Sequence, residues 1–180
     1  MTRLFIRRKA AALCLSTGAA FLIALPANGA TTTGNLGAGA SVAANCSIAT
    51  AAVAFGPYDP VVANAAAALT ATGSITVACS KGSAPTITLD LGANAVGAVR
   101  KMANGAERLV YELYMPPNTT PGAACGALTT IWGTTGANIF TPTSPASKAA
   151  RTYNVCGSIA ANQDVGVGAY SDTVVASVNF

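Results

Sequence analysis

The sequence predicts an all-β domain built as a two-sheet sandwich. Short runs of alternating apolar and polar residues recur along the chain, and Gly, Pro, Asn and Ser separate them, as is typical of strands joined by turns. No helical crossovers separate these runs, so a parallel sheet is not expected. The length of 180 residues is enough for one ordinary domain and short for two. We therefore expect one sandwich of antiparallel strands.

Residues 1–30 are expected to be a secretory signal peptide. A basic start, MTRLFIRRK, leads into an apolar run over residues 10–25, which Pro26 ends before a group of small residues. The run is shorter than the roughly 20 apolar residues that a membrane-spanning helix needs. Small residues favour cleavage after Gly29, and cleavage after Ala30 is the alternative. We therefore expect an exported protein.

The cysteines predict disulfide bonds. Cys14 lies in the expected leader, so Cys46, Cys79, Cys125 and Cys156 remain. An even number in an exported chain indicates two disulfides, with three possible connectivities. Pairing in sequence order would close two loops of about 30 residues, each contributing roughly 3–4 kcal/mol in the chain-entropy model. A zinc site is the alternative, but the chain has no C-x-x-C pair.

Composition argues against several classes of function. Charged residues make up 9% of the chain, and four of the ten Lys and Arg residues fall within the first nine positions, leaving six against six Asp and Glu. This balance gives no basic patch for nucleic acid. The chain has no histidine, the commonest general base. Six scattered acids do not form a calcium module. We expect no enzyme, no metal and no cofactor.

A few residues require separate consideration as site candidates. Glu107 and Glu112, and Asp164 with Asp172, are carboxylate pairs of the kind that a glycosidase uses. Such residues are more often turn acceptors or solvated, and Asp172 is predicted to be a turn residue. The single tryptophan, Trp132, would be a carbohydrate platform if exposed and a core or loop anchor if buried.

Strands are expected where apolar side chains alternate. A strand over residues 170–180 would end at the last residue with no polar tail, so its open edge must be covered or paired. The alanine-rich residues 61–71 are compatible with a helical turn or a long loop. The expected runs and shared faces are 73–79 (Ile75, Val77, Cys79), 86–91 (Ile87, Leu89, Leu91), 109–115 (Leu109, Tyr111, Leu113, Met115), the run around Cys156 (Tyr153, Val155, Ile159) and 170–180 (Val174, Ala176, Val178, Phe180).

The segment before the first mature cysteine alternates regularly. In residues 31–45 one face carries Leu36, Ala38, Ala40, Val42 and Ala44, and the other carries small residues including two glycines. Glycines make a weak strand, because they lose more backbone entropy on ordering. A flexible tail and an ordinary first strand of the same domain are both compatible with this pattern.

The carboxyl-terminal run resembles the ending of the spore coat protein U domain family. Its marks are G-x-I-x-x-x-Q at residues 157–163, then G-x-Y-x-D at residues 168–172, then an alternating strand. Other landmarks of the family occur upstream in the usual order, and the resemblance covers nearly the whole chain after the leader. These landmarks are Asn45-Cys46, Phe55-Gly56-Pro57-Tyr58, residues 75–79, residues 100–105, residues 109–114 and Ile131-Trp132-Gly133.

The resemblance implies a fold and a role. The family includes subunits of archaic chaperone–usher pili, which have an incomplete immunoglobulin-like β-sandwich lacking its last strand, completed by donor-strand exchange. A periplasmic chaperone lends a strand, and an outer-membrane usher exchanges it for the leading extension of the next subunit. The resemblance thus implies an extracellular pilus that supports adhesion and biofilm formation. A secreted spore-coat or matrix protein assembling without an usher is the alternative; a tip adhesin usually carries a further binding domain.

The family's parts carry over onto positions of this sequence. Residues 31–45 would be the extension, with the donor strand at about residues 31–44, and residues 46–180 would be the pilin domain. A Cys46–Cys79 bond would tie the first two strands, whereas a second bond, Cys125–Cys156, is not found in every member. The donor face would be Leu36, Ala38, Ala40, Val42 and Ala44, and the terminal strand bordering the acceptor groove would contribute Tyr170, Val174, Ala176, Val178 and Phe180.

Overall fold

The computed structural model describes residues 29–180. The expected signal peptide, residues 1–30, therefore lies outside the described residues except at its last two positions. The chain divides into two units, residues 1–40 and residues 41–180. Residues 29–45 carry no strand and are exposed. Every strand that the structure describes in residues 29–180 belongs to the second unit.

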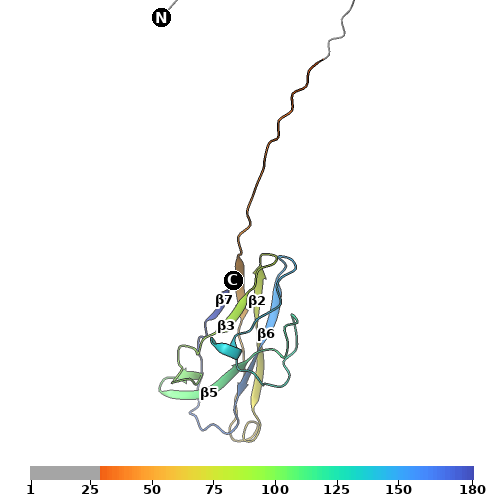
Figure 1. Cartoon of the computed structure of the whole chain (residues 1–180). Coiled ribbons are helices and arrows are strands. Elements are labelled where there is room, and N and C mark those ends of the chain that lie inside the picture. The colour runs from red at the N-terminus through yellow and green to blue at the C-terminus, as the bar shows by residue number, and fades with distance from the viewer. Residues whose placement is uncertain (1–28) are drawn as a thin grey trace, which may run out of the picture. The chain divides into compact units, whose positions relative to one another are not determined.

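The second unit is built from antiparallel strands in two sheets (Figure 1). The larger sheet has five strands in the order β1-β2-β6-β5-β4, and the smaller sheet pairs β3 with β7. A single short 3-10 helix covers Gly136–Asn138. The all-β prediction is thus confirmed. The strands are β1 (Cys46–Ala51), β2 (Leu69–Cys79), β3 (Thr86–Leu89), β4 (Lys101–Asn104), β5 (Glu107–Tyr114), β6 (Arg151–Ile159) and β7 (Ala176–Asn179).

The strands with large alternating side chains lie where the sequence predicts them. β2, β5 and β6 bury their expected faces, and they are neighbours or next neighbours in the larger sheet. β3 ends at Leu89, two residues earlier than expected. The predicted strand over residues 170–180 is wrong in extent, because only Ala176–Asn179 pair with β3. Residues 171–175 instead hydrogen-bond to Ala103 and to the loop at residues 90–94.

Residues 61–71 form neither a helix nor one long loop. The first part is a turn in which the Asp59 carboxylate accepts backbone N–H groups of Val61 (2.9 Å) and Val62 (3.1 Å). These hydrogen bonds hold the pKa of Asp59 below its usual value. The last part, from Leu69, already belongs to β2. A capped turn followed by a strand therefore replaces both alternatives.

The core lies between the two sheets and contains an aromatic stack. Trp132 is fully buried, and its indole N–H donates to the Ile87 carbonyl at 2.9 Å. Phe140 lies 5.0 Å from Trp132 and 5.0 Å from Tyr153, measured between ring centroids. Trp132 is consequently a core anchor, and the carbohydrate-platform alternative is wrong because no face of the ring is exposed.

Two disulfides join residues that are 33 and 31 positions apart in sequence. Cys46–Cys79 links β1 to β2 at residues that oppose each other in register. Cys125–Cys156 fastens the long connection between β5 and β6 to β6 itself. Each bond limits the freedom of the unfolded chain more than that of the folded one. The four cysteines within residues 29–180 are therefore all used as cross-links.

Two glycines let the chain after β1 cross over the larger sheet. A Cβ at Gly157 would lie 2.5 Å from Val53 Cγ1 and 2.6 Å from Phe55 Cζ. A Cβ at Gly73 would lie 2.7 Å from the Ala51 carbonyl oxygen. Real Cβ atoms do not tolerate such approaches without a backbone shift. The two glycines therefore leave the room in which residues 51–55 pack against the sheet.

Gly157→Ala is expected to lower the free energy of unfolding by about 1–3 kcal/mol, because the added methyl group overpacks against Val53 and Phe55. Urea denaturation followed by circular dichroism measures the change. Gly126→Ala is the matched control, since a Cβ there meets nothing within 4 Å. Equal midpoints for the two variants would contradict this account of the crossing.

Candidate functional site: a groove between two strand edges

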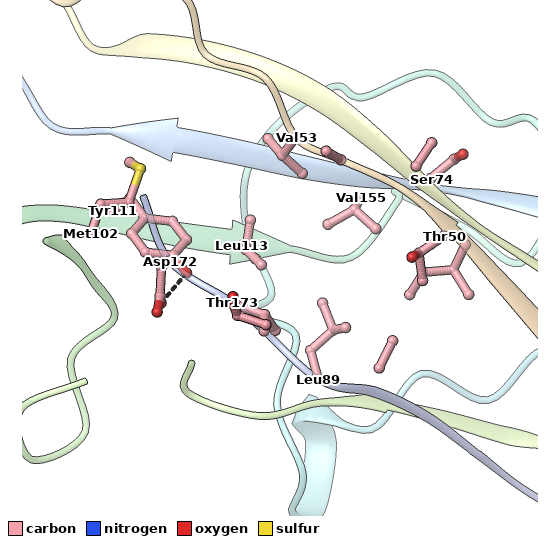
Figure 2. Close-up of a pocket in the computed structure, with 15 residues that line it drawn as sticks. Thr50, Val53, Ser74, Leu89, Met102, Tyr111, Leu113, Val155, Asp172 and Thr173 are labelled. Atoms are coloured by element: carbon pink, nitrogen blue, oxygen red, sulfur yellow. Dashed lines mark hydrogen bonds between the residues drawn. The ribbon is translucent and has the colours of Figure 1, made fainter. Parts of the chain in front are cut away.

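An apolar cavity of about 440 Å³ opens between β1 and the run that leads into β7. Figure 2 shows Thr50 and Val53 on one side and Asp172 and Thr173 on the other, with Leu113 between them. The cavity is open to solvent and is lined by residues from several segments. Its lining is Thr50, Ala51, Ala52, Val53, Ser74, Ile75, Leu89, Met102, Tyr111, Leu113, Val155, Asp172, Thr173, Val174 and Ala176.

The floor of this groove consists of core side chains from three neighbouring strands. Ile75 from β2, Val155 from β6 and Leu113 from β5 belong to the main buried cluster. Leu89 from the smaller sheet also lines the cavity. Apolar side chains that border an open cavity gain less from burial than those packed on all sides. The groove thus leaves space above core side chains that are themselves at most 5% exposed.

Both walls of the groove present strand edges. β1 is an end strand of the larger sheet, and β7 pairs with β3 through one side only. Within residues 29–180, no strand pairs with the second edge of either one. Such edges carry backbone N–H and C=O groups able to form a further ladder. An extended segment placed here would meet both a ladder and an apolar floor.

Hydrogen bonds to the 90–94 loop hold the β7-side wall in place. The Asp90 carboxylate accepts the Val175 N–H at 2.9 Å, and the Asp90 N–H donates to the Val175 carbonyl at 3.1 Å. The Ala93 N–H donates to the Thr173 carbonyl at 3.0 Å. Backbone groups of successive residues in an extended run point to opposite sides. Those of Val174 therefore face away from the loop, toward the groove.

Asp172 is a cross-link and not the turn residue that the sequence predicts. One carboxylate oxygen accepts the Asn94 N–H at 3.0 Å, and the other accepts the Tyr111 hydroxyl at 2.7 Å (Figure 2). Its partners lie about 60 to 80 positions away in sequence, so local pattern could not reveal them. Asp172 thereby attaches the groove wall to both the loop and the floor.

The environment of Tyr111 keeps its phenol neutral. Burial raises the pKa of Tyr111 above its ordinary value, and the hydrogen bond to the negatively charged Asp172 raises it further. The phenol therefore remains a hydrogen-bond donor at all physiological pH values. One end of the groove is closed by this neutral donor and its carboxylate acceptor.

The glutamate pair named as a catalytic candidate is not brought together. Arg100 is fully buried and forms an ion pair with Glu112, while two of its nitrogens donate to the Asp90 carbonyl at 2.6 and 3.0 Å and one donates to the Trp132 carbonyl at 2.6 Å. A buried guanidinium needs such partners. Glu107 is exposed at the start of β5. Glu112 therefore serves the frame of the domain.

The residues of the G-x-I-x-x-x-Q motif have structural roles. Gly157 lets the chain cross, as described above, and Ile159 is buried in the core. Gln163 accepts the Val110 N–H and donates to the Val110 carbonyl, both at 2.8 Å. β6 ends at Ile159, which pairs with Tyr111, so Val110 has no partner in β6. The Gln163 side-chain amide supplies the two hydrogen bonds that a strand would otherwise give to Val110.

The expected acceptor residues divide into two groups. Val174 and Ala176 line the groove. Val178 packs against the core, and the Tyr170 hydroxyl donates to the Gly166 carbonyl at 2.7 Å. Phe180 is 55% exposed and lies outside the groove lining. Sequence reasoning missed the β1 wall, because residues 50–53 are small and carry no alternating pattern of large apolar side chains.

The donor-face residues Leu36, Ala38, Ala40, Val42 and Ala44 are all exposed and carry no strand. The exposed fraction is 96% for Leu36 and 91% for Val42. Isolated exposed apolar residues are common on proteins, but here they repeat at every second position. Their assignment as a donor strand is taken up below as a proposal.

Other kinds of site find little support in residues 29–180. This part of the chain holds no group of three or more Cys, Asp or Glu side chains placed to bind a metal ion. It also contains no helix of the length and apolar character needed to span a bilayer.

The Tyr111–Asp172 contact is expected to make the free energy of unfolding decrease as the pH rises into the alkaline range. The unfolded phenol ionises near pH 10, whereas the folded phenol ionises at higher pH, so its contribution is complete below about pH 10 and is lost as pH rises further. We expect Tyr111→Phe to be about 1–2 kcal/mol less stable than the parent near pH 8. The difference should shrink by up to about 1.4 kcal/mol per pH unit above pH 10.

Urea titrations at several values from about pH 8 to about pH 11 measure this difference. Tyr114→Phe, on the opposite face of β5, is the control for general alkaline effects. A constant gap between the parent and Tyr111→Phe over that range would contradict the assignment.

Comparison with known proteins places the chain in a family. The model of the spore coat protein U domain matches residues 32–177. "Protein U" of Myxococcus xanthus is 34% identical over 192 residues, covering 94% of this chain and 97% of that protein. Both matches include most of the 31–45 segment as well as the sandwich.

A solved structure shares the fold. It is a pilin-subunit chain in the CsuC–CsuE chaperone–tip adhesion subunit pre-assembly complex from archaic chaperone–usher Csu pili of Acinetobacter baumannii, with a TM-score of 0.54 and 19% identity. The match covers 78% of this chain and 41% of that chain, so it concerns the fold of less than half of the larger protein. From the sequence matches, the chain belongs to the spore coat protein U domain family.

Proposed function

We propose that this protein is a structural subunit of an extracellular pilus, assembled by donor-strand exchange through a chaperone–usher pathway. The observation that carries the proposal is the apolar groove between β1 and residues 172–176, whose walls are two strand edges. In this proposal the sandwich is immunoglobulin-like and lacks its last strand. The groove is the place of that strand.

The proposed occupant is the 31–44 segment of a neighbouring copy or a related pilin. Its backbone would form ladders with the groove walls, while Leu36 and Val42 enter the apolar floor. Each of these two side chains would contribute roughly 1.5–3 kcal/mol if fully buried. Because the segment and the groove are different surfaces of the chain, such contacts do not close on themselves and produce a filament.

The proposed partners before assembly are a periplasmic chaperone and an outer-membrane usher. The groove leaves a cavity above core side chains and backbone groups without strand partners along its walls, both unfavourable compared with a filled and paired site. A chaperone strand would fill the groove until the usher exchanges it for the next subunit. The solved complex that shares the fold is described as a chaperone–subunit pre-assembly complex, which supports this order of events. The filament would support adhesion and biofilm formation at the cell surface.

Deletion of residues 31–44 tests the donor assignment. The shortened chain, co-expressed with its chaperone, should still form the chaperone complex and lose polymer completely, because the groove remains while the donor is gone. Size-exclusion chromatography and electron microscopy of periplasmic extracts measure the two species. Polymers of normal length from the shortened chain would remove the assignment.

Point variants in the same segment sharpen that test. Leu36→Asp and Val42→Asp should each reduce polymer at least tenfold, since a carboxylate would have to enter an apolar floor. Ser41→Asp adds the same charge beside Val42 on the other face of the segment and should have much less effect. The free energy of unfolding of the domain should be unchanged in all three variants.

The second candidate function is a secreted coat or matrix protein that assembles without an usher. The description of the matching family as a spore coat protein U domain, together with the match to Protein U over almost the full length of both chains, favours it. The two candidates differ in a strain that lacks the usher. The pilus proposal predicts that surface polymer is lost there while the chaperone complex accumulates, whereas the coat candidate predicts normal assembly. Immunoblots of surface and periplasmic fractions distinguish the outcomes.

A further inference from the structure

The contacts of Ser80 bear on which groove the leading segment fills. Ser80 directly follows Cys79 at the end of β2, opposite the start of β1. Its N–H donates to the Asn45 carbonyl at 2.8 Å, and its hydroxyl accepts the Asn45 N–H at 3.2 Å. The same hydroxyl donates to the Ala43 carbonyl at 3.3 Å. The β1–β2 pairing therefore continues beyond the strands to Asn45, and the Ser80 hydroxyl extends the contact to Ala43.

This continuation leads the chain away from its own groove. The groove wall on the β1 side begins at Thr50 and extends to Val53, downstream of Cys46. Residues 43–45 continue in the opposite direction, and the Cys46–Cys79 bond fixes the point where they start. The leading segment must therefore reverse direction before it can lie beside β1 of the same molecule.

With Ser80 holding residue 43, such a reversal places the wrong residues in the groove. The tightest reversal is a two-residue hairpin turn, which here would use residues 41 and 42 and pair residue 40 with residue 43. Counting along the antiparallel pair, Leu36 would lie opposite Ser47, short of the groove. The wall at residues 50–52 would then face the three threonines at positions 31–33.

Without the Ser80 contacts, a better register becomes accessible. A turn at residues 44 and 45 would pair residue 43 with Cys46 and bring Leu36 opposite Val53, which lines the groove. The donor segment could then fill the groove of its own molecule. A longer turn with residue 43 held in place only moves Leu36 further from the groove.

We propose that Ser80 is a specificity-determining residue that directs the leading segment into a second copy of this chain instead of its own groove. The inference rests on the proposed function, since it concerns the same groove and the same donor. It adds a reason why the segment is unavailable to its own domain: the hydroxyl of Ser80 fixes residues 43–45 in an orientation that permits only the unproductive hairpin.

A cross-linking experiment tests Ser80. The full chain, expressed with its leader and recovered oxidised after export, carries a photoreactive p-benzoylphenylalanine in place of Leu36. The parent should give a ladder of intermolecular products. Ser80→Ala should raise the ratio of internal to intermolecular cross-links about fivefold, the factor for one hydrogen bond of ordinary net strength. Sedimentation should show a matching rise in monomer.

Ser47→Ala is the matched control. Its hydroxyl lies on the same two strands and donates to the Ala78 carbonyl at 3.5 Å, without touching residues 43–45. It should leave the ratio unchanged. Equal ratios for the parent and Ser80→Ala, both with intermolecular ladders, would overturn the role of Ser80 alone. Cross-links that map to no groove residue in either chain, or mainly internal cross-links in the parent, would overturn donor-strand exchange as well.

Discussion

The groove depends on hydrogen bonds that hold its β7-side wall, residues 172–175, to the loop at residues 90–94. Five hydrogen bonds join residues 172–175 to residues 90–94, through backbone groups, the Asn94 side-chain amide and the carboxylates of Asp90 and Asp172. These bonds fix residues 172–175 to the loop, so that the wall lies apart from Thr50–Val53 and leaves the cavity of about 440 Å³ between them. The separation of the two walls is therefore set by polar contacts on the loop side.

The same polar contacts continue into the interior. The Asp90 carbonyl that accepts from buried Arg100 belongs to the residue whose carboxylate holds Val175. Arg100 in turn reaches Glu112 on β5 and the Trp132 carbonyl beside the aromatic stack. Removing one partner of such a buried pair leaves an uncompensated charge and is strongly destabilising. The wall is consequently attached to the most deeply buried part of the domain, and a strand entering the groove meets a preformed surface.

Large alternating side chains made part of the fold predictable from sequence. Ile75 and Val77 in β2, or Tyr153 and Val155 in β6, signal their buried face locally. Apart from Ile48, β1 carries small residues, and the strand is mostly exposed. The register of the 171–175 run depends on partners about 80 positions away. The groove arises where these two segments meet. Its β1 wall could therefore not be located from sequence pattern, whereas Val174 and Ala176 on the other wall could.

The composition of the leading segment indicates how an inter-subunit joint of this kind would be stabilised. Between Leu36 and Val42 the apolar face offers only Ala38 and Ala40, and each alanine buries little area. The intervening glycines lose more backbone entropy on ordering than other residues. Side-chain burial is then concentrated at two positions six residues apart, and the main-chain ladders with the two walls must contribute the remainder. A joint of that kind would depend on the separation of the two walls, so in the proposed filament its strength would depend on the hydrogen bonds that Asp90 and Asp172 accept.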